Sequence, residues 1–253
     1  MTAFAGMAAL FFLTALAYAM VGFGGGSTYT ALLVLAETDY RILPAISLAC
    51  NITVVTGSVW QYANAGLVRW RRLVPVMAFS VPLAWLGGMM EIPERAFIAL
   101  LGLALLASAI ALIIRRPTEA QNTAKSAPVW TGPALGGGIG FLAGLVGIGG
   151  GIFLAPAMHF LRWGPARDIA AAASVFILVN SIAGLAGQAQ RLSGSGDIGA
   201  IINYWPLLPA VLIGGQIGVW LGRTRTSETW LIRLTAVLVL FVALRLLWRA
   251  LGF

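Results

Sequence analysis

Residues 21–35 read VGFGGGSTYTALLVL, and residues 146–160 read VGIGGGIFLAPAMHF. Five of the first six residues are identical in the two stretches, which begin 125 residues apart. A glycine inside a helix costs about 1 kcal/mol relative to alanine, so each glycine cluster predicts a break after the apolar segment that precedes it. Because the break occurs twice, we interpret the chain as two internal repeats, a common feature of secondary transporters.

The composition indicates that lipid surrounds most of this chain. Of its 253 residues, 60% are hydrophobic and 9% are charged, and the mean hydropathy is +0.92. Soluble domains carry about 25% charged residues. Residues 96–114 form one continuous apolar run, close to the roughly 20 residues that a spanning helix needs, whereas a membrane β-barrel would alternate apolar and polar residues. The sequence predicts an all-α polytopic membrane protein.

The repeats are expected at residues 1–114 and 129–253, joined by the polar linker at 115–128. The predicted apolar segments are 3–20, 27–36, 45–64, 73–90 and 96–114, then 130–146, 151–161, 168–190, 203–222 and 229–250. The two segments that directly follow the glycines span only about 15 Å, half of a hydrocarbon core of about 30 Å. We therefore predict that each repeat consists of a re-entrant hairpin and three spanning helices.

The distribution of basic residues favours inverted repeats. If every broken segment crossed the membrane once, the repeats would be parallel, with nine Lys and Arg inside and seven outside. Re-entrant hairpins instead leave only five residues outside, namely Arg41, Arg95, Arg191, Arg245 and Arg249. The other eleven are then inside, namely Arg69, Arg71, Arg72, Arg115, Arg116, Lys125, Arg162, Arg167, Arg223, Arg225 and Arg233. The second division fits the positive-inside rule better and predicts both termini outside.

The glycine clusters also suggest a binding site for an anion. A helix that begins after such a cluster presents unpaired N–H groups and about half a positive charge, which together bind anions without a formal cation. The candidate residues are Gly22, Gly24, Gly25, Gly26, Ser27, Thr28, Gly147, Gly149, Gly150 and Gly151. Ser27 and Thr28 add hydroxyl donors, whereas Ile152 and Phe153 replace them in the second repeat, so we expect an asymmetric site near the midplane.

Polar residues within the predicted spans extend this candidate site. They are Ser47, Asn51 and Gln61 in the first repeat and Ser174, Asn180 and Gln188 in the second; Thr53, Thr56 and Ser181 also interrupt the apolar runs. Asn and Gln are costly in lipid and should face the protein interior. They either bond neighbouring helices or donate N–H groups to the anion. Gly214, Gly218 and Gly222, at four-residue spacing, are expected to serve helix packing.

The doubled motifs GFGGG (22–26) and GIGGG (147–151), with Pro156 five residues after the second, resemble the TauE/SafE family of sulfite and organosulfonate exporters. The resemblance covers essentially the whole chain, although Ala31 stands where the first repeat would have the corresponding proline. It implies a permease for small sulfur-containing anions such as sulfite, sulfoacetate or a related organosulfonate.

The function predicted here is export of such an anion, with no enzymatic activity, cofactor or metal. Two alternatives stay open, a passive anion channel and an intramembrane serine protease that pairs Ser27 with His159. The expected partners are the anion and the lipid bilayer, with a homodimer left open. The basic residues occupy short loops and helix ends, which indicates topology signals and not nucleic-acid binding. All eight acidic residues lie in predicted loops or at helix ends, so we expect the membrane potential, anion exchange or substrate protonation to drive transport.

Overall fold

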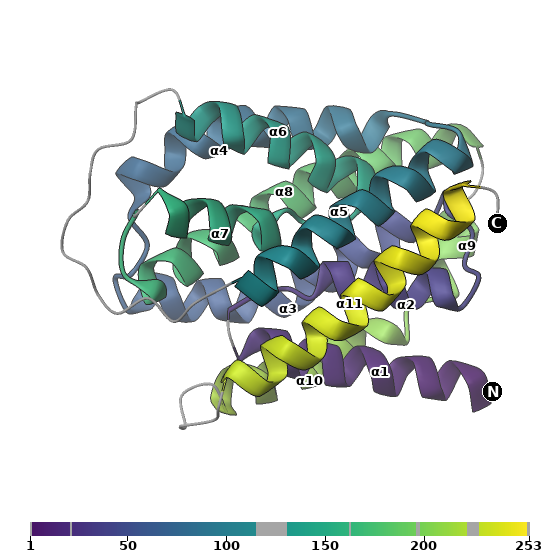
Figure 1. The fold of residues 1–253 in the computed structure, drawn as a ribbon, viewed down its shortest axis with the longest axis horizontal. Coiled ribbons are helices and arrows are strands. Elements are labelled where there is room, and N and C mark those ends of the chain that lie inside the picture. The colour runs from purple at the N-terminus through teal and green to yellow at the C-terminus, as the bar shows by residue number, and fades with distance from the viewer. Residues whose placement is uncertain are drawn as a thin grey trace.

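The computed structural model describes residues 2–20, 22–114, 131–161, 163–195, 198–221 and 228–251, and within these ranges it consists of helices and connecting turns. Most of the helices run along one common direction (Figure 1). The first five are α1 (Thr2–Ala19), α2 (Gly26–Leu35), α3 (Leu43–Asn64), α4 (Trp70–Met89) and α5 (Glu94–Ile114). Each lies within three residues of a segment predicted from the sequence.

The remaining helices are α6 (Thr131–Val146), α7 (Gly151–Phe160), α8 (Ala166–Ser195), α9 (Ile198–Ile202), α10 (Leu207–Leu221) and α11 (Glu228–Leu251). Two features differ from the prediction. Helix α8 continues five residues past the predicted end at 190, and the short helix α9 precedes α10. Hydropathy detects only the part of a helix that needs lipid, so the polar last turn of α8 carried no signal.

The helices of the bundle differ in whether they are long enough to cross a membrane. Among the described residues, three helices are long and apolar enough to cross a membrane, at Leu43–Asn64, Trp70–Met89 and Arg167–Gly194. Helices α2 and α7 have ten residues each, which is about 15 Å or half of a hydrocarbon core. Eight consecutive residues of α2, from Gly26 to Leu33, are buried. Helix α2 is therefore enclosed by the other helices.

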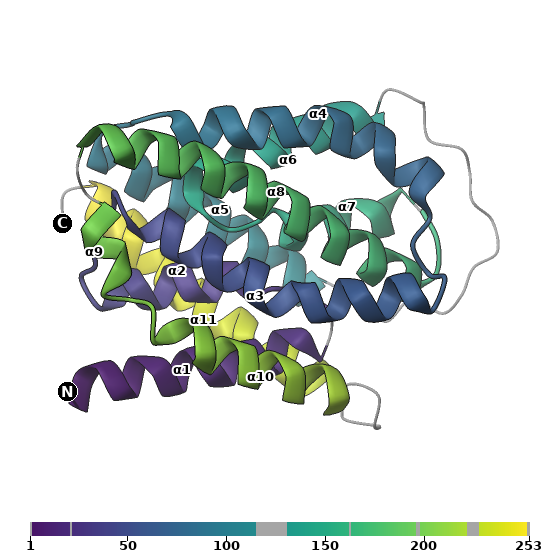
Figure 2. The ribbon, with the colours of Figure 1, turned by 180° about the vertical axis from the view of Figure 1, so that it is seen from behind.

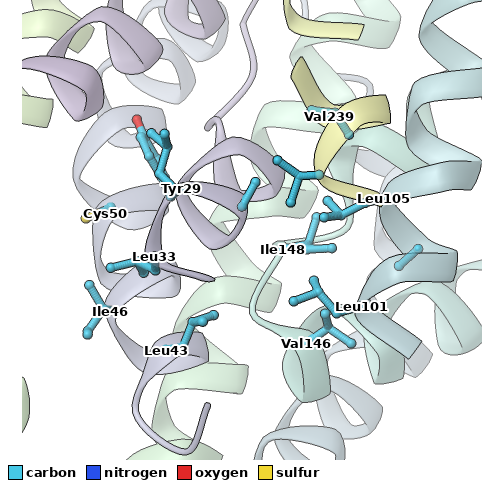
Figure 3. Packing of buried hydrophobic residues seen from close by; sticks show 14 of the residues in the cluster. Tyr29, Leu33, Leu43, Ile46, Cys50, Leu101, Leu105, Val146, Ile148 and Val239 are labelled. Atoms are coloured by element: carbon cyan, nitrogen blue, oxygen red, sulfur yellow. The ribbon is translucent and has the colours of Figure 1, made fainter. Parts of the chain in front are cut away.

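Figure 3 shows how α2 is held. Tyr29 and Leu33 of α2 belong to the same cluster of buried side chains as Ile46 and Cys50 of α3 and Leu101 of α5. Val146 and Ile148, beside the second glycine loop, belong to this cluster too. Cys50 is almost fully buried in this cluster, where it packs as a small hydrophobic residue.

Two pairs of long helices run antiparallel. Arg191 Nη2 near the end of α8 donates a hydrogen bond of 2.5 Å to the carbonyl of Arg41, just before α3. Further along the same pair, Gly184 lies against Leu48. Likewise Arg95 Nε at the start of α5 donates to the carbonyl of Ala250 at the end of α11, at 3.0 Å. The start of α3 thus lies beside the end of α8, and the start of α5 beside the end of α11.

Two other pairs run parallel with backbones in close contact. Helix α6 runs alongside α4 in the same direction, with Gly140 against Ser80 and Gly144 against the carbonyl of Ala84. Helix α10 runs alongside α1 in the same direction, with Gly214 against the carbonyl of Phe12 and Gly218 against the carbonyl of Leu16. The packing role predicted for Gly214 and Gly218 is confirmed, and Gly222 lies outside the described residues.

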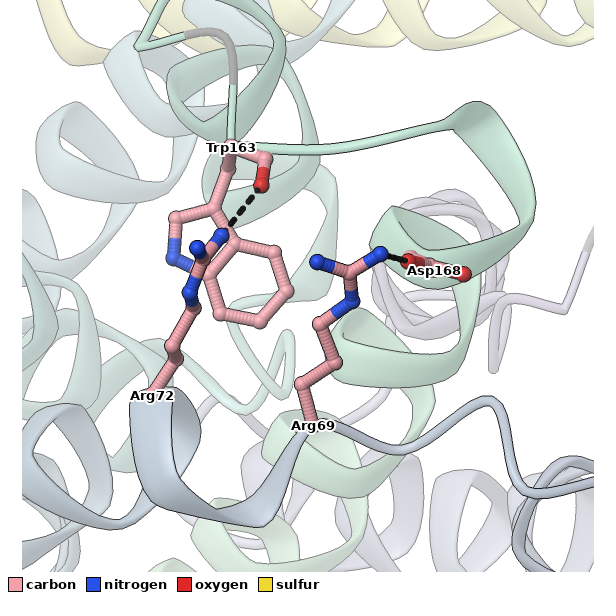
Figure 4. A network of polar contacts seen from close by, with 4 residues as sticks. All are labelled: Arg69, Arg72, Trp163 and Asp168. Atoms are coloured by element: carbon pink, nitrogen blue, oxygen red, sulfur yellow. Dashed lines mark hydrogen bonds and ion pairs between the residues drawn. The ribbon is translucent and has the colours of Figure 1, made fainter. Parts of the chain in front are cut away.

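Apart from the two glycine loops, the connecting loops lie mainly at the two ends of the bundle (Figure 1). The first and last described residues lie at the same end (Figure 1). At the opposite end, Arg69 Nη2 pairs with Asp168 Oδ2 at 2.5 Å, and Arg72 Nη1 donates to the carbonyl of Trp163 at 3.1 Å (Figure 4). Since Arg69 is about half exposed, this ion pair contributes at most about 1 kcal/mol. Its main consequence is to join the α3–α4 turn to the start of α8.

The contact between α4 and α6 yields a stability prediction. A side chain at Gly144 would overlap the backbone of Ala84, whereas Gly138 on the same helix is exposed with open space beside it. We expect Gly144→Val to lower the stability of the detergent-solubilised protein by about 1–3 kcal/mol, because overpacking forces the helices apart. Thermal unfolding of Gly144→Val and Gly138→Val measures this, and equal midpoints in the two variants would contradict the packing described.

Candidate functional site

The two glycine loops share positive φ angles at two corresponding glycines and differ at a third, since Gly149 also has a positive φ of 80° and Gly24 does not. Gly22 and Gly25 have φ angles of 83° and 87°, and Gly147 and Gly150 have φ angles of 81° and 79°. Such positive φ values are accessible to glycine at little cost and strained for other residues. The motif needs glycine at these positions because the chain reverses direction inside the bundle there.

The short helices begin in the same way after each loop. The N–H groups of Thr28 and Tyr29 both donate to the carbonyl of Gly25, at 3.0 Å each. In the second loop, Phe153 and Leu154 donate to the carbonyl of Gly150, at 3.1 Å each. The N–H groups of Gly26, Ser27, Gly151 and Ile152 precede these bonds. They are the donors that a helix N-terminus offers to a capping group or an anion.

Asn51 of α3 lies between the two loops. Its Nδ2 donates to the carbonyl of Ile148 at 3.2 Å. A side-chain carbon on Gly24 would lie 2.5 Å from Asn51 Oδ1, and one on Gly149 would lie 2.8 Å from Asn51 Nδ2. A side chain on Gly26 would overlap both the Asn51 amide and the carbonyl of Ile148. The absence of side chains at these glycines is what lets the loops meet around Asn51.

The two aligned serines hold the first loop. Ser47 Oγ donates to the carbonyl of Gly26 at 3.1 Å, and Thr30 Oγ1 contacts the same carbonyl at 2.7 Å and Ser47 Oγ at 3.0 Å. Ser174 Oγ of α8 lies 2.5 Å from the carbonyl of Gly22 and 2.8 Å from that of Ala170. Both serines are fully buried. Their protons are directed to backbone carbonyls, so their observed role is to position the loop.

Ser27 and Thr28 are buried and face α1. Tyr18 Oη lies 3.2 Å from Ser27 Oγ and 2.9 Å from Thr28 Oγ1. The hydroxyls that the sequence suggested as donors to an anion thus share a cluster with Tyr18. Tyr18 was not among the predicted residues, because a tyrosine near the end of an apolar helix looks like an interfacial anchor.

The other predicted polar residues lie at different distances from the loops. Asn180 Nδ2 donates to the carbonyl of Phe176 on its own helix, at 2.8 Å. Gln188 Nε2 donates to the carbonyl of Gly144 at 3.0 Å, and its Oε1 accepts from Arg191 at 2.6 Å. Gln61 lines a groove of about 480 Å³ between α3 and α10, with Trp60 and Gln216. The structure does not bring Gln61 and Gln188 to the junction of the loops.

Three buried polar atoms near the loops have no hydrogen-bond partner within the described ranges. They are Asn51 Oδ1, Ser181 Oγ and Tyr29 Oη, the last of which would lie 3.2 Å from a side-chain carbon on Gly25. Asn180 Oδ1 of α8 also has no partner in the described ranges. A side-chain carbon on Gly149 would lie 3.0 Å from Ser181 Oγ, so Ser181 borders the same junction as Asn51. The sequence marked Ser181 only as a polar residue in an apolar run, since its contact with Gly149 depends on how α8 crosses the loop.

The described residues contain no group of three His, Cys, Asp or Glu side chains that could hold a metal. Asp168, one of the acidic residues, is paired with Arg69 at an end of the bundle. His159 belongs to the last turn of α7, and its side chain lies outside the described set. The charge at the junction therefore comes from backbone dipoles and amide groups of the residues described.

Comparison with known proteins places the chain among membrane transporters. Residues 7–246 match the family described as "Sulfite exporter TauE/SafE". The "Probable membrane transporter protein y4hK" of Sinorhizobium fredii is 36% identical over 247 residues, which cover 96% of this chain and 98% of that protein. The "Probable membrane transporter protein YunE" of Bacillus subtilis is 32% identical over 102 residues, or 40% of this chain and 36% of that protein. No solved structure matches.

These matches agree with the apolar helices of the structure, so the chain is a multi-pass membrane protein and a transporter, not an enzyme. The intramembrane protease considered from Ser27 and His159 is thereby set aside. The resemblance carried by the two GGG motifs is confirmed over almost the whole sequence, and the chain belongs to the sulfite exporter TauE/SafE family.

Proposed function

We propose that this protein is a secondary permease of a bacterial cytoplasmic membrane that exports a small sulfur-containing anion, such as sulfite, sulfoacetate or a related organosulfonate. The anion binds where Gly24–Thr28 meets Gly149–Phe153, near the middle of the bundle. The observation that carries this proposal is the contact of both glycine loops with the single residue Asn51. Two helix N-termini that converge on one buried point form a favourable position for negative charge.

We further infer two inverted repeats, residues 1–114 and 129–253, joined by the linker at 115–128. Under this assignment α3 corresponds to α8 and α5 to α11, and both pairs run antiparallel. Parallel repeats would leave corresponding helices parallel. The same assignment makes α4 correspond to α10 and α6 to α1, so the close pair α4·α6 corresponds to the close pair α10·α1. The φ angles of Gly22 and Gly25 also match those of Gly147 and Gly150.

The inverted arrangement also agrees with the path of the first hairpin, which turns back inside the bundle. Gly22 lies beside Tyr62 near the end of α3, whereas Gly24 and Gly26 lie beside Asn51 in its middle. Helix α2 then leads back to the start of α3, so the first hairpin returns to the end of the bundle where α1 began. Three crossings per repeat follow, and the two termini share a side of the membrane, as the division of eleven basic residues to five suggested.

A passive anion channel would use the same binding site. Transport kinetics separate the two, since only a carrier gives a saturable flux that is stimulated by substrate on the opposite side. We favour the carrier because the junction is closed: Ser27, Thr28 and Asn51 are all at most 2% exposed. In the proposed carrier, a conformational change would open this buried junction to each side of the membrane in turn.

The first prediction from this proposal concerns the glycines with positive φ. In Gly25→Val and Gly150→Val the new side chain is strained and lies closer to its neighbours than an ordinary van der Waals contact. One of these neighbours is Thr14 of α1 at the first loop, and another is Phe176 of α8 at the second loop. We expect both variants to lose at least about tenfold in affinity, or about 1.4 kcal/mol, for whichever anion binds in a thermal-shift screen of sulfite, sulfoacetate, thiosulfate, sulfate and carboxylates.

Gly66→Val supplies the matched control, because Gly66 also has a positive φ, 67°, but has open space beside it in the turn after α3. It introduces similar backbone strain in the turn after α3, away from the junction at Asn51, and the variant should bind like the unmodified protein. Unchanged affinity in both loop variants would rule out the proposed site.

The second prediction concerns topology. Ala36 lies directly after α2 and Gly164 lies a few residues after α7, and inverted repeats put them on opposite sides of the membrane. In intact cells, a membrane-impermeant maleimide should label Ala36→Cys, whereas Gly164→Cys should react only after permeabilisation. The native Cys50 is buried, so the unmodified protein controls for background. Labelling of both variants from one side would indicate parallel repeats.

A further inference from the structure

The orientation of the Asn51 amide is fixed by its neighbour. The carbonyl of Ile148 can only accept a hydrogen bond, so the nitrogen of the amide must face it, as the 3.2 Å contact records. The oxygen Oδ1 then faces Gly24. Asn51 is fully buried, and in the described part of the chain Oδ1 has no hydrogen-bond donor.

An acceptor in this position is unexpected for a site that binds only negative charge. A buried acceptor without a donor costs about 1–3 kcal/mol. A fully deprotonated oxyanion offers only acceptor oxygens, so it would leave Oδ1 unsatisfied and be repelled by it. Asn180 Oδ1 on α8 is also a buried acceptor without a donor in the described ranges, since its amide nitrogen is bonded to the carbonyl of Phe176.

We propose that the ligand of this site carries an O–H group in addition to its negative charge, and that Asn51 Oδ1 accepts the hydrogen bond from it. This inference rests on the proposed function and specifies its substrate. The anionic oxygens would accept hydrogen bonds from the N–H groups of Gly26 and Ser27 at the start of α2. The O–H group would donate to Asn51 Oδ1 beside Gly24. Ser181, which borders Gly149, completes the polar surroundings.

Two kinds of molecule share this chemistry, a protonated oxyanion such as hydrogen sulfite and a sulfonate with a hydroxyl group. In the first case the acidic proton is the donor, and one proton crosses the membrane with every anion. In the second case the donor is permanent and transport carries the charge of the sulfonate alone. The two cases differ in their dependence on pH.

The test measures binding to the purified full-length protein with matched probes. The first pair is 2-hydroxyethanesulfonate and ethanesulfonate, which differ by one hydroxyl group and do not titrate near neutral pH. The second probe is sulfite, measured on both sides of its second ionisation, with ethanesulfonate as the control for titration of the protein itself. We expect either about tenfold tighter binding of the hydroxylated sulfonate, or sulfite affinity that rises about as steeply as the fraction of hydrogen sulfite.

Variants assign the effect to Asn51. Asn51→Leu removes the acceptor and should reduce the preference for the O–H probe to about one, whatever happens to absolute affinity. Gly24→Ala is the second variant, because its methyl group would lie 2.5 Å from Oδ1, which is too close, so the Asn51 side chain must shift and Oδ1 loses its present position while the acceptor itself is retained. Ser58→Ala is the control, since Ser58 is a buried residue of the same helix whose hydroxyl, within the described chain, also has no partner.

The outcomes separate this inference from the proposed function. Equal binding of the two sulfonates, together with sulfite binding that does not change with pH, would overturn the O–H requirement and leave an anion site in place. A preference for the O–H probe that persists in both Asn51→Leu and Gly24→Ala would also overturn it. Failure of every sulfonate and of sulfite to bind would instead contradict the proposed function.

Discussion

A helix that ends inside a membrane exposes backbone N–H and C=O groups that lipid cannot satisfy. This constraint governs the structure around both glycine loops. The loops lie within the bundle, where Ser47 and Thr30 contact the carbonyl of Gly26, Ser174 contacts that of Gly22, and Asn51 contacts that of Ile148. The long helices α3 and α8 carry Ser47, Asn51 and Ser174, so the interrupted helices depend on the intact ones.

The same constraint explains why the loops are a suitable place for a ligand. The carbonyls of Gly22, Gly26 and Ile148 are satisfied by side chains, whereas the first N–H groups of α2 and α7 precede the intrahelical hydrogen bonds and are left to a capping group. Asn51 joins the loops through its nitrogen and presents an oxygen beside Gly24. A molecule that both accepts from N–H groups and donates to Oδ1 would satisfy all of these atoms together. A purely apolar occupant would satisfy none.

The sequence predicted the helices and the loops but not the hydrogen bonds among them. Apolar runs and the echo of GFGGG in GIGGG are local patterns, and they placed ten of the eleven described helices, most of them to within a few residues. The partner of Ser174, in contrast, is Gly22, 152 residues away, and no local pattern encodes that contact. The contact of Ser181 with Gly149 was missed for the same reason. Tyr18 was missed because a tyrosine near the end of an apolar helix looks like an interfacial anchor, and α9 because five residues are too few to show a helical period.

The most direct test of this account is to locate a bound anion that carries a heavy atom. Crystals of the protein soaked with 3-bromo-2-hydroxypropanesulfonate, which carries both a sulfonate and an O–H group, would give an anomalous signal from bromine. The ligand should occupy the junction between Gly26 and Gly149, beside Asn51. The account predicts a peak next to these residues that Gly25→Val abolishes. A peak only in the groove between α3 and α10, beside Gln216, or an empty junction at saturating ligand, would contradict it.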